Sequence, residues 1–291
     1  MTRQSSIELI KSILTTPPID LTVPDSGFEV HSLTSTKHIL YYLWGIKSLI
    51  KLSGLRPTVV IHDDGTLTSG NIDLLVSHLP GAKIIRANQA DVHVLQRLRG
   101  YPSCIKYRQN EPFAKKVFDV FFYSKSQKVL ILDSDILFIN RTSEIINWVN
   151  SGDKQILYNH DPIDSEVRMH QKIKKGLNLD YISGYNSGLQ CTFTKVFNID
   201  LFEAYLTFLY NHNLVDWVTE QRGMSLLAHQ YGRCRPLSRD RYFFQNRKSV
   251  YYNRRKISTF NRELVAKHYS RYSRSLFISE GINYLVNSGF L

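Results

Sequence analysis

Cysteine is scarce in this 291-residue sequence, and the three that occur, Cys104, Cys191 and Cys234, lie far apart. Because no Cys-x-x-Cys pair is present, the sequence predicts neither a disulfide framework nor a cysteine-based zinc site, and it fits a reducing cytoplasm. No uninterrupted apolar run approaches the roughly 20 residues that a membrane-spanning helix requires. Residues 1–14 also lack the segments of a signal peptide, in which a basic region is followed by an apolar region and a cleavage site of small residues. We therefore expect a cytoplasmic protein.

Internal repeats and low-complexity linkers are missing as well. Hydrophobic residues make up 43% of the chain and charged residues 21%, which is typical of a folded globular protein and excludes an intrinsically disordered one. A chain of this length is long enough to form one large α/β domain. The sequence therefore predicts a single compact domain.

The formal net charge of +12 is concentrated in the last third of the chain. Between Arg222 and Arg274 there are fourteen lysines and arginines against two acids, Asp240 and Glu263, whereas the rest of the chain is neutral. Such an excess predicts an anionic partner: phosphate groups, an anionic membrane surface contacted peripherally, or nucleic acid. Aromatic residues suited to base stacking are interleaved with these cations: Tyr242, Phe243, Phe244, Tyr251 and Tyr252. A nucleic-acid-binding protein is therefore one alternative.

Strands and helices alternate through the first half of the chain. Apolar runs predict strands at 28–34, 58–62, 82–86 and 129–132, and helical periodicity predicts helices at 37–53, 69–78 and 112–123. Gly54 stands at the expected C-cap of the first of these helices, and Pro57 follows it. This alternation predicts an α/β fold with a mixed, mainly parallel sheet flanked by helices. Two more helices are predicted in the second half, at 200–210 and 220–230.

Polar residues follow three of the predicted strands. These segments are Thr34-Ser35-Thr36, Asp63-Asp64-Gly65 and Asp133-Ser134-Asp135. In open α/β sheets, ligands bind beyond the carboxyl ends of the strands. We therefore expect the three segments to border one site.

Asp133 and Asp135 have apolar runs on both sides, 129–132 and 136–139. Two side chains at positions i and i+2 of an extended segment point the same way. Two neighbouring carboxylates stay ionised readily only when a cation lies close to both. Carboxylate oxygens suit Mg²⁺ or Mn²⁺, which complete their coordination with phosphate oxygens of a substrate. The pair therefore predicts a divalent metal site.

Three later segments accompany this pair: Tyr185-Asn186-Ser187-Gly188-Leu189, Trp217-Val218-Thr219-Glu220-Gln221 and Lys267-His268-Tyr269-Ser270-Arg271-Tyr272-Ser273-Arg274. Together with the Asp133-Ser134-Asp135 motif and with Lys116, seventeen residues before it, they resemble glycosyltransferase family 8, whose members have the GT-A fold of nucleotide-diphospho-sugar transferases. The resemblance extends in pieces over roughly residues 28–276. It implies a GT-A domain at 28–291. Helical spacing at 6–14, which stops before Pro17-Pro18, predicts that residues 1–27 form a helical extension rather than a membrane anchor.

Within that domain, the resemblance implies a nucleotide-binding half at about 28–140 and an acceptor-binding half at about 141–291. It implies that Asp133, Asp135 and His268 bind Mn²⁺ or Mg²⁺. The donor-binding residues that it implies are Thr34, Ser35, Asp63, Asp64, Lys116, Ser134, Asn186, Ser187, Gly188, Lys267 and Arg271. The catalytic residues that it implies are Glu220, Gln221 and Arg274. Three positions depart from the family pattern: Lys116 replaces an arginine, Glu220 an aspartate and Arg271 a glycine.

The activity that the resemblance implies is metal-dependent transfer of a sugar from a nucleoside-diphosphate sugar, with a UDP-sugar favoured, to an acceptor hydroxyl. Such a reaction belongs to glycan or glycolipid synthesis, and the acceptor can be a saccharide, a lipid-linked molecule or a protein. The family retains the configuration of the anomeric carbon. A Glu220 carboxylate acting as a general base beside the acceptor hydroxyl would instead give inversion.

Two other enzyme classes share part of this pattern. Haloacid-dehalogenase phosphatases also carry Asp-x-Asp after a strand, but their motif lies near the N-terminus and an acidic pair far downstream holds Mg²⁺. The basic C-terminal third of this chain offers no such pair. Nucleotidyltransferases that make activated sugars generally carry a glycine-rich loop after the first strand, whereas Ser32 to His38 contains no glycine. The phosphatase therefore stays as an alternative, and the nucleotidyltransferase is disfavoured.

Overall fold

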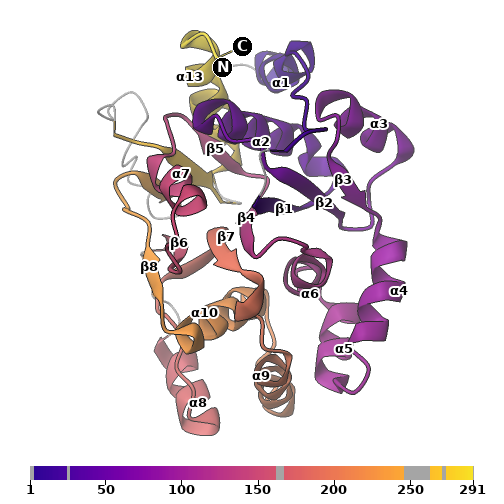
Figure 1. Cartoon of the computed structure of the whole chain (residues 1–291), viewed down its shortest axis with the longest axis vertical. Helices are drawn as coiled ribbons and strands as arrows, with labels where there is room; N and C mark the ends of the chain where they lie inside the picture. Colours follow the sequence, from indigo (N-terminus) through magenta and orange to yellow (C-terminus); the bar gives the residue numbers. More distant parts are fainter. Residues whose placement is uncertain (1–2, 25–26, 162–166, 246–262, 271–272, 291) are drawn as a thin grey trace.

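The computed structural model describes residues 3–24, 27–161, 167–245, 263–270 and 273–290, and its centre is a seven-stranded sheet (Figure 1). In spatial order the strands are β3 (Lys83–Ile85), β2 (Thr58–Asp63), β1 (Phe28–Thr34), β4 (Lys128–Leu132), β7 (Tyr185–Phe193), β6 (Ile156–His160) and β8 (Cys234–Pro236). Strands β1 to β4 run parallel, whereas β7 is antiparallel to both β4 and β6. The predicted mixed, mainly parallel sheet is confirmed.

A second, three-stranded sheet joins segments from distant parts of the chain. It consists of β5 (Ile136–Phe138), β10 (Ala266–Tyr269) and β9 (Tyr242–Gln245). Strand β10 lies between the other two, antiparallel to β5 and parallel to β9. The sequence did not predict this sheet, because strands of three or four residues carry too little periodicity to be recognised. Its consequence is that β10 lies directly beside the segment that follows β4.

Helices cover both faces of the central sheet. The α-helices are α1 (Arg3–Lys11), α2 (Ile39–Ser53), α3 (Ser69–His78), α4 (Ala87–Arg97), α5 (Pro102–Asn110), α6 (Ala114–Tyr123), α7 (Ser143–Asn150), α8 (Val167–Leu177), α9 (Ile199–Asn211), α10 (Thr219–Tyr231), α12 (Arg274–Leu276) and α13 (Asn283–Asn287). Shorter turns of 3₁₀-helix occur at η1 (Ser12–Thr15), η2 (Thr36–His38) and η3 (Thr194–Val196), and η5 (Phe277–Ile282) is a π-helix. Helices α2 and α6 lie on opposite sides of β1 and β2 (Figure 1). None of the described helices is long and apolar enough to cross a membrane.

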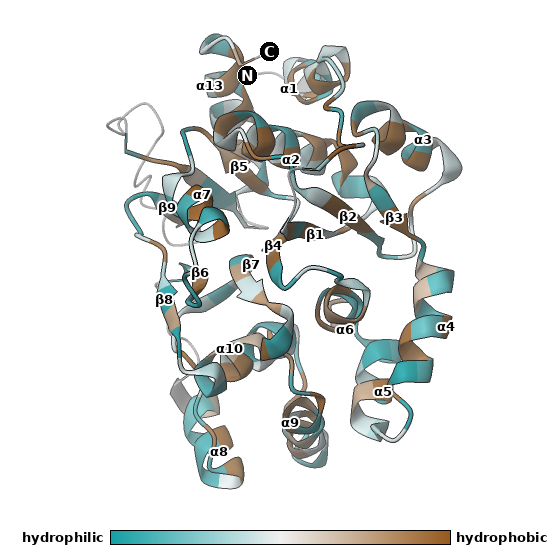
Figure 2. Cartoon of the chain, viewed as in Figure 1, coloured by the Kyte–Doolittle hydropathy of each residue, from teal (hydrophilic) through white to brown (hydrophobic). Residues whose placement is uncertain are grey.

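The predicted end of α2 is confirmed. Gly54 has a left-handed backbone with φ of 69°, and its N–H donates to the carbonyl oxygen of Ile50 at 2.9 Å. Glycine adopts this conformation without steric cost, so it terminates the helix cleanly. Apolar residues are concentrated along the central strands (Figure 2), and the four residues of β4 from Val129 to Leu132 are all buried. The core therefore forms around the strand that leads into the aspartate pair.

The N-terminal segment is attached to the rest of the protein through α2. Nε1 of Trp44 donates to the carbonyl oxygen of Ile10 at 3.0 Å. The buried ammonium of Lys47 donates to Thr16 Oγ1 at 2.7 Å and to the carbonyl oxygen of Pro17 at 2.9 Å. These contacts join the short helix expected in residues 1–27 to the main body.

Candidate metal and donor site

Asp133 and Asp135 lie in the turn that connects β4 to β5. The N–H of Asp133 donates to the carbonyl oxygen of Gly188 at 2.7 Å, and the N–H of Tyr269 donates to the carbonyl oxygen of Asp135 at 2.9 Å. The two aspartates were expected in an extended segment, but Ser134 and Asp135 form a turn. The chain has to leave the central sheet here to enter the small sheet. Backbone hydrogen bonds to β7 and β10 therefore position the two aspartates. The alternation of side chains along a single strand does not set their positions.

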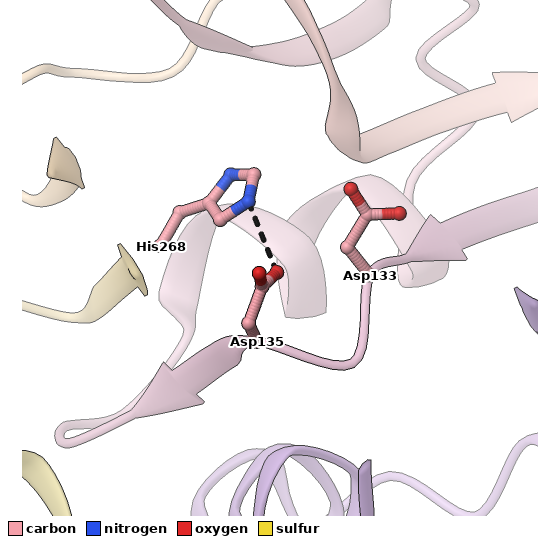
Figure 3. A group of neighbouring side chains, drawn as sticks. All are labelled: Asp133, Asp135 and His268. Atoms are coloured by element: carbon pink, nitrogen blue, oxygen red, sulfur yellow. Dashed lines mark ion pairs between the residues drawn. The ribbon is translucent and has the colours of Figure 1, made fainter. Parts of the chain in front are cut away.

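His268 completes a cluster with this pair (Figure 3). One potential ligand atom from each of Asp133, Asp135 and His268 lies within 4.8 Å of the others. Nε2 of His268 lies 3.2 Å from Oδ1 of Asp135. Burial alone would raise the pKa of the Asp135 carboxyl, but the hydrogen bond and charge of His268 and the charge of Arg274 hold it below its ordinary value. Asp135 is therefore an ionised carboxylate despite its burial.

Asn186 fixes the orientation and tautomer of the His268 ring. Oδ1 of Asn186 lies 3.1 Å from Nδ1 of His268 and also accepts the N–H of Gly188 at 3.1 Å. Nδ2 of Asn186 donates to Oε1 of Gln221 at 3.2 Å. Because Oδ1 can only accept, Nδ1 of the imidazole carries a proton, and Nε2 is the ring atom that faces Asp135. At this distance either a proton or a bound cation lies between Nε2 of His268 and the carboxylate oxygen of Asp135.

Because Gly188 has no side chain, His268 and Asp133 can lie close to the backbone of β7. A Cβ atom at this position would lie 2.4 Å from Cε1 of His268 and 2.7 Å from Oδ2 of Asp133. Such distances are too short for any side chain to be accommodated without movement of the two metal-ligand candidates. Ser187, beside it on β7, is also buried. The Asn-Ser-Gly segment therefore shapes the candidate metal site directly.

Lys116 on α6 joins the aspartate pair to α10. Its Nζ lies 2.7 Å from Oδ1 of Asp133, donates to Oγ of Ser187 at 3.3 Å and lies 4.0 Å from Oε2 of Glu220. Burial would lower the pKa of the Lys116 ammonium, but Asp133 and Glu220 outweigh it and raise that pKa. Lys116 is therefore a permanent buried cation between two carboxylates.

Glu220 and Gln221 open α10 and meet the Asn-Ser-Gly segment. Oγ of Ser187 donates to Oε2 of Glu220 at 2.9 Å, and Oε1 of Gln221 accepts from Asn186. Oε1 of Glu220 is buried and accepts no hydrogen bond from any residue that the structure describes. Burial raises the pKa of the Glu220 carboxyl, and Lys116 only partly offsets this. An unused buried acceptor at this position is suited to a hydroxyl of a bound molecule.

Of the basic residues that the resemblance implies at the site, Arg274 and Lys267 point in different directions. Nη2 of Arg274 lies 3.5 Å from Oδ2 of Asp135, and its side chain is 37% exposed, so it faces the cluster. Lys267 precedes His268 in β10 and therefore points to the opposite side of the strand. Its buried Nζ lies 2.6 Å from Oε2 of Glu280 rather than beside the cluster. Arg271 lies outside the described residues.

The polar ends of β1 and β2 form the neighbouring edge of the site. Thr34 and Ser35 are buried, and Oγ1 of Thr34 has no hydrogen-bond partner among the described residues. Asp63 is among the residues expected to bind the donor, but its Oδ1 accepts the N–H groups of Gly65 and Leu67, and its Oδ2 lies 3.2 Å from Nε of Arg86. Its carboxylate thus holds the loop after β2.

Among the described residues, the carboxylate of Asp64 has fewer partners than the carboxylate of Asp63. Its Oδ1 accepts from the N–H of Thr66 at 2.9 Å and from Oγ1 of the same residue at 2.7 Å. The carbonyl oxygen of Asp64 accepts from Nζ of Lys115 at 2.6 Å, which ties this loop to α6. Ser134, the middle residue of the Asp133-Ser134-Asp135 segment, is buried.

His38 is a residue near the cluster that the sequence did not indicate. Its Nδ1 lies 3.1 Å from Oγ of Ser35. Burial has the largest effect on the His38 imidazole and lowers its pKa, and the charge of Arg274 lowers this pKa further. The charge of Asp135 raises it. The only signal in the sequence is its position four residues after a strand end, which many structural residues share. His38 therefore borders the same space as Ser35 and Arg274.

Comparison with known proteins supports the fold. The sequence matches no protein-family model and no curated protein. Solved structures do match: the galactosyltransferase LgtC, in complex with donor and acceptor sugar analogs, has a TM-score of 0.57 at 14% identity over 89% of this chain and 95% of that one. Mouse xyloside xylosyltransferase 1 has a TM-score of 0.53 at 12% identity, with 88% and 99% covered. The bifunctional glycosyltransferase WbbM has a TM-score of 0.51 at 16% identity, with 85% and 46% covered.

Each of these proteins is a glycosyltransferase, and the match to the first two extends over nearly their whole length. At such low identity the likeness establishes the path of the backbone rather than the chemistry. The chain therefore has the GT-A fold, as its resemblance to glycosyltransferase family 8 implies.

Proposed function

We propose that this protein is a metal-dependent glycosyltransferase that moves a sugar from a nucleoside-diphosphate sugar to an acceptor hydroxyl. The observation that carries the proposal is the convergence of Asp133, Asp135 and His268 at the carboxyl end of β4 in a GT-A fold. Open α/β sheets bind ligands at this edge. The surrounding residues supply both a cation site and hydrogen-bonding groups for a sugar.

The residues present fit a divalent cation. Asp133 and Asp135 offer hard carboxylate oxygens, and His268 offers the lone pair of Nε2 because Asn186 holds the proton on Nδ1. Gly188 keeps the space beside the ligand atoms clear. Mn²⁺ or Mg²⁺ bound there would supply positive charge to the diphosphate oxygens and stabilise the departing nucleotide.

Arg274 is proposed to bind the departing diphosphate. Its guanidinium faces Asp135 and is partly exposed, so a bound phosphate can reach it. A planar guanidinium binds two phosphate oxygens at once and keeps its charge at every physiological pH. Lys267 has no such role in this proposal, because its ammonium is paired with Glu280.

The donor sugar is proposed to lie between the Asn-Ser-Gly segment and the start of α10. The unused Oε1 of Glu220 accepts one of its hydroxyl groups, and Lys116 holds the other carboxylate oxygen in place. Because Glu220 accepts a hydrogen bond from Ser187 and lies beside Lys116, we do not assign it as the general base that activates the acceptor hydroxyl. We therefore propose that the reaction retains the anomeric configuration, as the resemblance implies. Comparison of the anomeric configuration of donor and product by NMR tests this assignment.

The nucleotide is proposed to bind along the ends of β1 and β2, against Thr34, Ser35 and Asp64. A UDP-sugar is the favoured donor on the basis of the family resemblance. Asp63 contributes indirectly, because both of its oxygens hold the loop rather than face a base. Binding of UDP, GDP and CDP, each in the presence of Mn²⁺, measures the base preference directly.

The deciding experiment is donor hydrolysis with Mn²⁺ and a panel of UDP-, GDP- and CDP-sugars, with and without EDTA. We expect hydrolysis of at least one donor that EDTA abolishes and that Asp135→Asn also abolishes. Asp73→Asn, which changes an exposed aspartate on α3, serves as the matched control and should behave like the wild type. Absence of both metal-dependent hydrolysis and a thermal shift with every donor would contradict the proposal. Hydrolysis of simple phosphate monoesters would instead support the phosphatase alternative.

A further inference from the structure

Trp217 is the most exposed large apolar side chain in the described part of the molecule, with 78% of its surface accessible to water. The other two tryptophans of the chain, Trp44 and Trp148, are buried. Leaving an indole in water forgoes roughly 25 cal/mol for each Å² of apolar surface that burial would remove. An exposed indole combines a flat apolar face with an N–H donor, which suits it to contact another molecule.

The turn that carries this tryptophan is held rigidly. Oδ1 of Asp216 accepts the N–H of Val218 at 3.1 Å, and Oγ1 of Thr219 accepts the N–H of Asp216 at 2.9 Å. Arg222 binds the second carboxylate oxygen of Asp216. The hydroxyl of Tyr205 donates to the carbonyl oxygen of Thr219 at 3.1 Å. A side chain presented by a rigid backbone loses less entropy on binding than one on a flexible loop.

This rigid turn adjoins the proposed sugar site. Trp217 lies three residues before Glu220 and four before Gln221, which contact Ser187 and Asn186 on β7. Trp217 lies in the turn before α10, where the N–H of Thr219 donates to the carbonyl oxygen of Asp216 at 3.1 Å, so its backbone lies close to the start of the helix. The turn that carries the exposed indole thus leads directly into the residues proposed to hold the donor sugar.

We propose that Trp217 stacks on a sugar ring of the acceptor, so that the acceptor of this enzyme is a saccharide. This inference rests on the proposed function. A sugar ring has an apolar C–H face and a polar edge, which match the flat apolar face and the N–H of an indole. The position beside Glu220 and Gln221 places such a ring next to the donor, where its hydroxyl can receive the transferred sugar.

Kinetics with matched variants tests the inference. The acceptors are methyl β-galactoside, methyl β-glucoside and lactose, and the variants are Trp217→Ala, Trp217→Phe and, as control, Tyr284→Ala. Tyr284 is also an exposed aromatic residue, but it lies on α13, at the opposite end of the molecule from α10 (Figure 1). We expect Trp217→Ala to raise the KM for the sugar acceptor about tenfold, which corresponds to about 1.4 kcal/mol, and Trp217→Phe to raise it less. Donor hydrolysis, which needs no acceptor, should stay at the wild-type rate in all three.

Fluorescence gives an independent measurement because Trp217 is the one tryptophan of three that water reaches. The same glycosides should protect the wild-type protein from acrylamide quenching, and Trp217→Phe should abolish both the quenching and its protection. Protection by anionic phospholipid vesicles but not by glycosides would overturn the inference in favour of a membrane contact. An unchanged acceptor KM in Trp217→Ala would overturn it as well. If the wild type shows no metal-dependent donor hydrolysis, the proposed function itself fails, which separates the two outcomes.

Discussion

Gly188 and His268 are packed so closely that a single methyl group would not fit between them, since a Cβ atom on Gly188 would lie 2.4 Å from Cε1 of the imidazole. The glycine comes from β7 of the central sheet and the histidine from β10 of the small sheet. Their approach brings the candidate metal ligands of two sheets into one cluster.

Gly188→Ala should therefore weaken Mn²⁺ binding, because the added methyl displaces His268 or Asp133. It should also lower the free energy of unfolding by about 1–3 kcal/mol, the usual cost of overpacking. Gly152→Ala is the matched control, because no atom lies within 4 Å of the added Cβ there. Isothermal titration with Mn²⁺ and denaturant unfolding measure the two effects. Equal Mn²⁺ affinity in the two variants would contradict the assigned role of Gly188.

Asn186→Leu should reduce Mn²⁺ affinity by about 10- to 100-fold, the usual effect of removing a residue that orients a metal ligand. The reason is that Oδ1 of Asn186 holds the proton on Nδ1 of His268 and leaves Nε2 free. Asn186→Asp keeps an acceptor at this position and should bind Mn²⁺ more tightly than Asn186→Leu. The measurement is Mn²⁺ titration in the absence of donor. If both variants bind like the wild type, the histidine does not depend on Asn186.

Lys116→Met should destabilise the fold, because Asp133 and Glu220 lose their shared buried cation. Removing one partner of a buried ion pair costs about 3–5 kcal/mol, and the lower end applies here because the Asp133 side chain is 32% exposed. Lys116→Arg keeps the charge and should recover part of the loss. Unfolding in guanidinium with EDTA present gives the stability without metal. Lys125→Met, at an exposed site, should change it by less than about 0.5 kcal/mol. A Lys116→Met protein as stable as this control would refute the ion-pair assignment.

A buried histidine pair should make stability fall in mild acid. Nδ1 of His31 lies 2.9 Å from Nε2 of His62, and burial lowers the pKa of both imidazoles below the ordinary 6.5. The unfolded chain therefore binds protons below about pH 6.5 that the folded protein does not, so stability is lost as the pH falls below this value. His62→Gln keeps an N–H donor for His31 but does not titrate.

The measurement is the difference in free energy of unfolding between the wild type and His62→Gln from pH 7.5 to 5.5. We expect the wild type to lose stability relative to the variant over this range. Parallel pH profiles would show that His62 is not held neutral in the folded protein.

The sequence determined the elements whose signal is local. The continuous apolar run at 129–132 predicts β4, because a strand that is buried on both faces of a sheet carries apolar side chains on both faces. The same pattern places Asp133 and Asp135 at the edge of the sheet where ligands bind. Gly54 marks the end of α2 because few other residues adopt its backbone conformation readily. His268 and Arg274 were indicated only through the family resemblance, since a lone histidine in a basic segment has no periodicity of its own.

Tertiary structure decided which of these side chains face one another. Lys267 and His268 are neighbours in the sequence, yet their side chains lie on opposite sides of β10, so only the histidine reaches the aspartate pair. That outcome depends on the register between β10 and β5, which joins segments about 130 residues apart. The contact between Asn186 and His268 depends on both sheets at once. Local patterns fix where a strand ends, but only the packing of distant strands fixes which groups meet there.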